Sequence, residues 1–188
     1  MKTLFRNSVL WFTILILLQG CESTAHLYRS DNRKKVYFGY INDGTYSQIK
    51  QFLSTATSKL NDTIFIKYEY NNETCWNYND QHRSDDEIRL GISRWQAFLQ
   101  ETQNNRKSIS IFRYREPGNN LNKIVKFDSS IQIDNKKFLY NLLFKTRTTC
   151  GSSIMIMPDK RFLFIRSDSH FEALFKTKQE IEDILNKK

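Results

Sequence analysis

The stretch SSIMIMPDKRFLFIRS, residues 152–167, contains two apolar runs separated only by Pro158, Asp159 and Lys160. Both runs are rich in branched and aromatic residues, which pack well on the half-buried surface of a sheet. A three-residue connection between such runs is typical of a β-hairpin. The stretch therefore predicts two neighbouring antiparallel strands near the end of the chain.

Upstream of this hairpin, strand-like runs alternate with helical patterns. Strands are predicted at 36–41 (VYFGYI), 63–70 (TIFIKYEY) and 108–114 (SISIFRY), with a further short strand at 123–127 (KIVKF) and a turn at 42–44. Helices are predicted where apolar residues recur at spacings of three and four. Their apolar faces are Ile49, Phe52, Leu53, Ala56 and Leu60; Ile88, Ile92, Trp95, Phe98 and Leu99; Phe138, Leu139, Leu142 and Leu143; and Ile181, Ile184 and Leu185.

Polar residues mark the starts of three of these helices. Ser84 with Glu87, and Thr177 with Glu180, have the spacing of a capping box. Asp134 is expected to cap the helix that follows it. The resulting order is strand, helix, strand, helix, strand, helix, strand, strand, helix, which predicts an α/β fold with a mixed central sheet and helices on both faces.

The chain has 188 residues and a formal net charge of +9. This length suits a single domain with a core of its own. Acidic residues are interspersed among the Lys and Arg residues, so a solvated basic surface is favoured over a nucleic-acid-binding one. We expect no nucleic-acid partner.

Residues 1–20, MKTLFRNSVLWFTILILLQG, have the pattern of a secretion signal peptide. Lys2 and Arg6 precede an apolar run from Val9 to Leu18. A helix that spans a bilayer needs about 20 apolar residues, so this run is too short for a permanent span. Loss of the signal peptide takes two positive charges away, from +9 to +7.

Leu18, Gln19, Gly20 and Cys21 resemble the lipobox of bacterial lipoproteins, although Gln19 is unusual in its place. The resemblance implies cleavage before Cys21 and attachment of lipid to its sulfur, which holds the domain at a membrane of the bacterial cell envelope, outside the cytoplasm. Residues 21–35 would form a basic tether attracted to anionic lipids, and residues 36–188 the domain. The alternative is a plain signal peptide or an uncleaved signal anchor.

The order of elements from Val36 onward is similar to the thioredoxin fold. Two stretches look like parts of TlpA-type redoxins: the hairpin at 152–165, and RLGISRWQAFLQE at 89–101, which looks like the helix after the active site. A cysteine, Cys75, follows the second predicted strand, as in that family. The resemblance implies a thioredoxin-like three-layer sandwich and thiol–disulfide redox activity.

The sequence departs from the redoxin pattern at its active site, because Cys-x-x-Cys and the cis-proline are not retained. If Cys75 is the first cysteine, Tyr78 occupies the second position. If the helix at 89–101 sets the register, the two cysteine positions fall on Asp85 and Ile88, and Cys75 lies in the preceding loop.

The resemblance implies that Cys75 and Cys150 are neighbours, because the loops after the second strand and before the fourth meet at one end of such a sheet. An exported protein lies where disulfides persist. A structural bridge over a loop of about 75 residues would stabilise the domain by ~4 kcal/mol. Alternatively, Cys75 and Cys150 are catalytic and exchange with a protein thiol partner, or Cys75 alone is a nucleophile.

Trp76 and Tyr78 are candidates for binding a partner peptide, since aromatic side chains often anchor interfaces; packing beneath the loop is the alternative. His82 and His170 are candidate metal ligands together with the two cysteines. No pair of these residues has the close spacing of a recognised metal site, so neither a metal nor another cofactor is predicted.

Overall fold

The computed structural model describes residues 35–118 and 123–186. The predicted signal peptide, the lipidation site Cys21 and nearly all of the tether lie outside the described residues.

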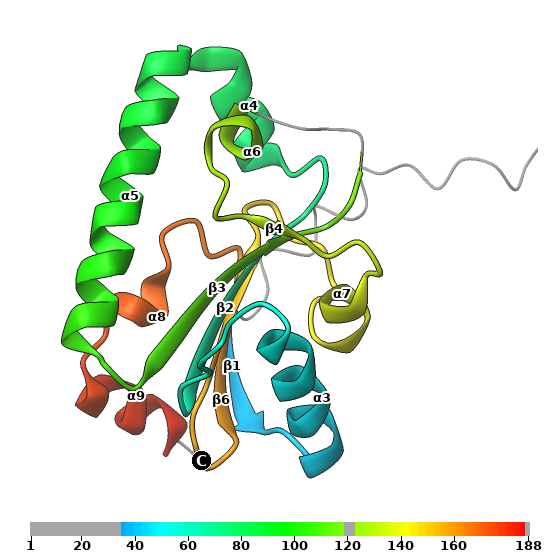
Figure 1. Cartoon of the computed structure of the whole chain (residues 1–188), viewed down its shortest axis with the longest axis vertical. Coiled ribbons are helices and arrows are strands. Elements are labelled where there is room, and N and C mark those ends of the chain that lie inside the picture. The colour runs from blue at the N-terminus through cyan, green and yellow to red at the C-terminus, as the bar shows by residue number, and fades with distance from the viewer. Residues whose placement is uncertain (1–34, 119–122, 187–188) are drawn as a thin grey trace, which may run out of the picture. The chain divides into compact units, whose positions relative to one another are not determined.

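In the described part of the chain, six strands form one mixed sheet in the order β1-β6-β5-β2-β3-β4 (Figure 1). Strands β2, β3 and β4 run parallel, whereas β5 is antiparallel to β2 and β6, and β6 is antiparallel to β1. The predicted hairpin and the three predicted strands before 115 are confirmed. The bounds are β1 (Val36–Tyr40), β2 (Thr63–Glu69), β3 (Ile109–Arg115), β4 (Gln132–Ile133), β5 (Ser152–Ile156) and β6 (Arg161–Arg166).

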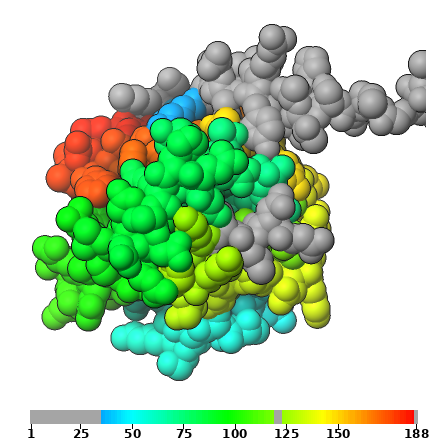
Figure 2. All heavy atoms as spheres, turned by 90° about the horizontal axis from the view of Figure 1, so that it is seen from above, coloured from blue at the N-terminus to red at the C-terminus, as the bar shows by residue number. Residues whose placement is uncertain are grey.

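Helices cover both faces of this sheet, as predicted. They are α3 (Asp43–Ser54), α4 (Thr74–His82), α5 (Asp85–Asn105), α6 (Lys123–Phe127), α7 (Phe138–Leu142), α8 (Glu172–Phe175) and α9 (Lys178–Leu185). Figure 1 shows α3 and α7 on one side of the sheet and α5, α8 and α9 on the other. In the space-filling view of Figure 2, the cyan residues around α3 and the orange-red C-terminal helices lie at opposite sides of the molecule.

Strand β2 is buried on both faces, because alternate side chains of a strand point to opposite sides of the sheet. Ile64 and Ile66 pack with Leu53 of α3 in one core cluster. Phe65 packs in a second cluster that includes Ile181 of α9. The sheet is therefore the middle layer of three.

The predicted helix caps are formed. The Ser84 hydroxyl accepts a hydrogen bond from the Glu87 backbone N–H, and the Glu87 carboxylate accepts one from Ser84 N–H at 2.8 Å. Thr177 and Glu180 make the same reciprocal pair at the start of α9. The Asp134 carboxylate accepts from the first N–H groups of α7, including that of Phe138 at 2.7 Å.

The prediction of a strand at 123–127 is wrong, because KIVKF forms the short helix α6. Ile124 packs against Ile88 and Ile92 of α5 rather than joining the sheet. The start of α6 is fixed by Asp80, whose two carboxylate oxygens accept from the Lys123 N–H at 2.9 and 3.0 Å. This cap comes from another helix, α4.

Two further predictions need correction near α3. The residues expected to form a turn, 42–44, instead begin the helix, since the Asn42 side chain accepts from Thr45 N–H as its N-cap. The helix ends at Ser54, so Ala56 and Leu60 lie beyond it. In the described residues, no helix has the length and apolar character needed to cross a membrane.

Candidate functional site

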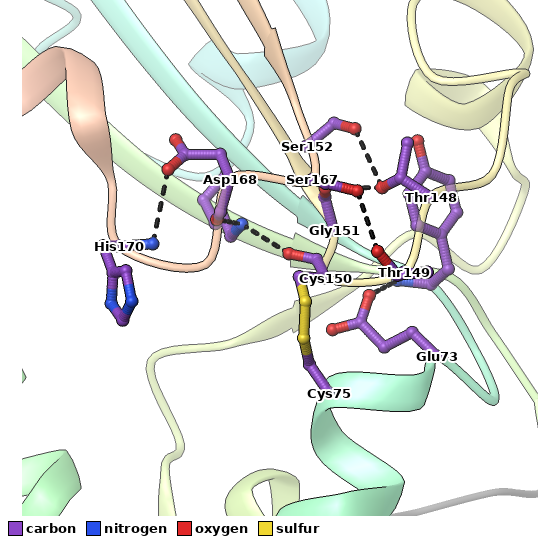
Figure 3. Close-up of a disulfide and its surroundings, with 12 residues drawn as sticks. Glu73, Cys75, Thr148, Thr149, Cys150, Gly151, Ser152, Ser167, Asp168 and His170 are labelled. Carbon is purple, nitrogen blue, oxygen red and sulfur yellow. Dashed lines mark hydrogen bonds between the residues drawn. A yellow bond between two sulfur atoms is a disulfide. The ribbon is translucent and has the colours of Figure 1, made fainter. Parts of the chain in front are cut away.

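Cys75 and Cys150 form a disulfide at one end of the sheet (Figure 3), where their Cα atoms are 5.1 Å apart across a sequence separation of 75 residues. Cys75 lies in the first turn of α4, shortly after β2, and Cys150 lies in the loop that leads into β5. The Cys75 N–H donates to the Thr149 carbonyl at 3.1 Å. Both cysteines are half-buried. The prediction that they are neighbours is confirmed, whereas a catalytic role stays a prediction.

The surroundings of Cys75 differ from expectation, because the residues expected in a loop form the helix α4. Its nine residues begin after the N-cap Glu73, and none of the nine is buried. Cys75 therefore lies in the first turn of a helix, where the helix dipole favours a negative charge, although its own N–H is already bonded to the Thr149 carbonyl.

The two central parallel strands place a group of charged side chains on the α5 side of the sheet. Lys67 of β2 lies opposite Arg113 of β3, and Glu69 lies opposite Arg115. All four are at most 7% exposed. A buried charge is costly unless it is paired. The Glu69 carboxylate has the Arg113 guanidinium 3.5 Å away, but neither of its oxygens accepts a hydrogen bond.

Arg113 has an acidic partner on each side. Its guanidinium forms an ion pair and hydrogen bond with the Asp128 carboxylate, which follows α6. A second nitrogen of the same group lies 3.5 Å from a Glu69 carboxylate oxygen. The pair joins β3 to the segment after α6, next to the disulfide.

Lys67 connects β2 to the cysteine loop. Its ammonium donates to the Cys150 carbonyl at 3.1 Å and to the Asp168 carbonyl, and its side chain is buried. Burial lowers the pKa of Lys67 below its ordinary value, and the Asp168 carboxylate opposes this shift.

Glu73 is buried immediately before the helix that carries Cys75. One of its carboxylate oxygens accepts from the Tyr70 N–H at 2.9 Å, and the other has no hydrogen-bond partner. Burial, and then the charge of Glu69, raise the pKa of Glu73 well above its ordinary value. The Glu73 side chain is therefore protonated over a wider pH range than an exposed glutamate.

A pocket of about 690 Å³ adjoins the disulfide. Both cysteines, Trp76 and Tyr78 contribute to its lining, so the structure brings together the site residues predicted within the described part of the chain. Residues of α5 and of the segment after β6 also line the pocket, including Ile88, Ile92, Trp95, His170 and Phe171. Arg113 and Asp128 also line the pocket, which combines apolar walls with buried charge.

The two predicted aromatic residues have different environments. Trp76 is half-buried and packs against the cluster formed by Ile88 and Ile124, among others. Tyr78 is 60% exposed and stacks on His82 with ring centroids 4.2 Å apart. The Trp76 side chain is therefore partly used in core packing, whereas the Tyr78 ring is exposed to solvent at the edge of the pocket.

His82 and His170 do not share a ligand set. The His82 ring nitrogen Nδ1 contacts the Tyr78 carbonyl at 2.9 Å, and His170 lines the pocket. In residues 35–118 and 123–186, no group of three His, Cys, Asp or Glu side chains is arranged to hold a metal ion.

Lys67, Arg113, Asp128 and Phe171 belong to the site but were not predicted from the sequence. A signal for Lys67 was present: it interrupts TIFIKYEY, a strand whose neighbours are apolar and which is buried on both faces. A charge at such a position requires a specific partner, which points to a buried polar site. The other three lie on segments far from β2 in sequence.

Comparison of the chain with known protein families, curated proteins and solved structures gave no match. The fold and the site define a mixed α/β protein. Its disulfide adjoins a partly apolar pocket, and buried charged side chains form part of the lining of that pocket.

Proposed function

We propose that this chain is a lipid-anchored protein of the bacterial cell envelope, and that its thioredoxin-like domain exchanges the Cys75–Cys150 disulfide with the thiols of a partner protein. The sheet topology supports the thioredoxin-like assignment. Strands β2 and β3 are parallel and are connected through α4 and α5, while the β5–β6 hairpin continues the sheet antiparallel on the other side of β2. Helix α9 follows the hairpin.

The single observation that carries the redox proposal is the position of the disulfide. Cys75 lies in the first turn of α4, and both sulfur-bearing residues are half-buried at the wall of the pocket. A helix amino terminus lowers the pKa of a nearby thiol, and the thiolate is the form that reacts. A pocket next to the sulfurs offers a partner polypeptide a place to bind.

The exchange conserves electrons between the two proteins. A dithiol partner gives up two electrons and becomes a disulfide, while Cys75 and Cys150 accept them and become a dithiol. In the reverse direction the reduced chain converts a partner disulfide to a dithiol. No cofactor is required for either direction.

The second candidate is a binding or scaffold lipoprotein in which the disulfide is structural. Tyr78 at the position of a second active-site cysteine favours this candidate, since the usual dithiol pair is not retained. The bridge would then act by holding α4, which has no buried residue of its own, against the β5 loop. The pocket would bind a ligand without exchange chemistry.

Trapping experiments with glutathione separate the two candidates. The full chain in detergent is incubated with reduced glutathione, quenched with acid and mapped by mass spectrometry. We expect a mixed disulfide on one of the two cysteines within minutes under native conditions. If glutathione adds only after denaturant unfolds the chain, the exchange function is wrong and the structural role remains.

A further inference from the structure

Lys67 is hydrogen-bonded to the backbone of Cys150. Its ammonium donates to the carbonyl oxygen of Cys150 at 3.1 Å, and the same group donates to the carbonyl of Asp168. The side chain is only 2% exposed. A charged donor in this position is shielded little by water, so its effect on a nearby thiolate is larger than at the surface.

The cysteine loop is shaped to admit this ammonium. Gly151, next to Cys150, has φ of +71°, a conformation that favours glycine. A Cβ atom there would lie 2.6 Å from the Tyr68 carbonyl oxygen and 3.0 Å from Lys67 Nζ. The absence of a side chain at 151 thus leaves room for Lys67 beside the loop.

An ammonium has three N–H donors. Two of those on Lys67 are accounted for by the carbonyls of Cys150 and Asp168. We propose that Lys67 is a positioning residue for the thiol chemistry: its ammonium, held on the Cys150 peptide, stabilises the thiolate that Cys150 carries once the disulfide opens. This inference rests on the proposed exchange function. It adds that the Cys150 sulfur is the leaving group when the disulfide opens.

The proposed sequence of bonds follows from that stabilisation. A partner thiolate attacks the Cys75 sulfur, the Cys75–Cys150 bond breaks, and its electron pair leaves on the sulfur of Cys150, the residue whose carbonyl accepts from Lys67. The second partner thiolate then attacks the partner sulfur of the mixed disulfide and releases Cys75 as a thiolate. The partner loses two electrons and the chain gains two. A better-stabilised leaving thiolate departs faster. The proposal therefore requires that Lys67 stabilises the Cys150 thiolate more than the helix amino terminus stabilises the Cys75 thiolate, and attack is then directed to Cys75.

Other charged groups near the two cysteines distinguish less between the Cys75 and Cys150 thiolates than Lys67 does. Arg113 is offset by its ion pair with Asp128, and Glu73, whose pKa is raised by burial, is protonated over a wide range. Lys67 is distinguished by its hydrogen bond to the Cys150 peptide. The ionisable groups that line the pocket with the two cysteines are Lys67, Tyr78, Arg83, Glu87, Arg113, Asp128 and His170. Glu69, Glu73 and Asp168 also act on the charge of Lys67.

The test measures thiolate formation in single-thiol versions of the reduced full chain, all carrying Cys21→Ser. Cys75→Ser leaves Cys150, and Cys150→Ser leaves Cys75; thiolate absorbance is followed against pH in each. Adding Lys67→Met should raise the Cys150 midpoint by about 1 pH unit and the Cys75 midpoint by less. Lys67→Arg, which keeps the charge, should restore most of the Cys150 shift. An unchanged Cys150 midpoint, or equal shifts at both cysteines, overturns the proposal.

Substitution of the buried Lys67 could prevent folding, so a second measurement keeps Lys67 in place. In the reduced Cys21→Ser chain, the pH dependence of Cys150 alkylation by iodoacetamide is read by peptide mapping. Its midpoint should lie about 1 unit below the ordinary cysteine value of ~8.5, and a midpoint at or above that value contradicts the inference. Because these midpoints are measured on reduced protein, they test Lys67 even if glutathione trapping shows that the disulfide does not exchange.

Discussion

Arg113 and Asp128 form an ion pair that is almost completely removed from solvent, with side-chain exposures of 7% and 0%. The pair connects a central strand to the segment after α6 and lines the pocket beside the disulfide. Removing one partner of a buried pair leaves the other charge unpaired in a poorly solvated place, which is more destabilising than loss of the attraction alone.

We therefore expect Arg113→Met to lower the free energy of unfolding by about 3–5 kcal/mol, as measured by urea denaturation. Asp85→Asn is the control, because Asp85 is 60% exposed in its pair with Lys123 and exposed pairs contribute little. If both variants lose the same small amount, the Arg113–Asp128 pair is not the stabilising contact described here.

Glu73→Gln should change how stability depends on pH. The pKa of Glu73 is raised in the folded chain, so the folded state holds a proton that the unfolded chain releases above about pH 4.3. Its stabilising contribution is full below that pH and is lost as pH rises through the folded pKa. Relative to the parent, Glu73→Gln should gain stability as the pH rises from about 5 toward the folded pKa of Glu73, by up to ~1.4 kcal/mol per pH unit, and the gain should level off above that pKa.

Glu87→Gln is the matched control in the same pH series. Hydrogen bonds from Ser84 lower the pKa of Glu87 in its capping box, so its contribution is lost only as pH falls below about 4.3. Its effect should not vary between pH 5 and 8. Parallel melting-temperature curves for the parent and Glu73→Gln would show that Glu73 carries no extra proton.

Two glycines should respond in opposite ways to alanine. Gly151→Ala combines a positive φ with a contact of 2.6 Å to the Tyr68 carbonyl, so we expect a loss of at least ~2 kcal/mol. Gly91, within α5, has open space where a Cβ would lie. Gly91→Ala should therefore stabilise the chain by roughly 0.5–1 kcal/mol. Chemical denaturation measures both, and a neutral Gly151→Ala would contradict the loop geometry.

Membrane anchoring depends on Cys21 in the proposed function. In a bacterial expression host, Cys21→Ser should move the chain from the membrane fraction to the soluble envelope fraction, because the acyl chains have no attachment site. Cys75→Ser keeps Cys21 and should stay with the membranes. Unchanged membrane association of Cys21→Ser would favour an uncleaved signal anchor instead.

Strands β1, β2, β3, β5 and β6 were predictable because they carry local signals, whereas β4 was not predicted. Alternating apolar residues in β2 and the short connection of the β5–β6 hairpin are properties of neighbouring residues. The capping boxes at Ser84 and Thr177 are local in the same way. The proximity of Cys75 and Cys150 could be predicted only from the resemblance to the thioredoxin fold, which supplies the order of the strands in the sheet.

The parts that were missed depend on distant residues or have weak patterns. Helix α4 has no buried residue and its N-cap Glu73 makes no side-chain capping bond, so neither periodicity nor a cap marks it. Helix α6 is capped by Asp80, which is 43 residues from Lys123, and five residues cannot distinguish a helix from a strand by periodicity. The hydrogen bonds of Lys67 are made to the carbonyls of Cys150 and Asp168, which are far from Lys67 in sequence, so local sequence patterns could not predict them.

The reduction potential of the Cys75–Cys150 pair tests the exchange function most directly. The full chain is equilibrated in glutathione buffers of known ratio, and the oxidised fraction is read from alkylated peptides, with Cys75→Ser as the blank. We predict a potential between about −270 and −180 mV, the range of disulfides that exchange with other proteins. A potential below about −300 mV would mean that the bond is a permanent structural bridge and would contradict the proposed function.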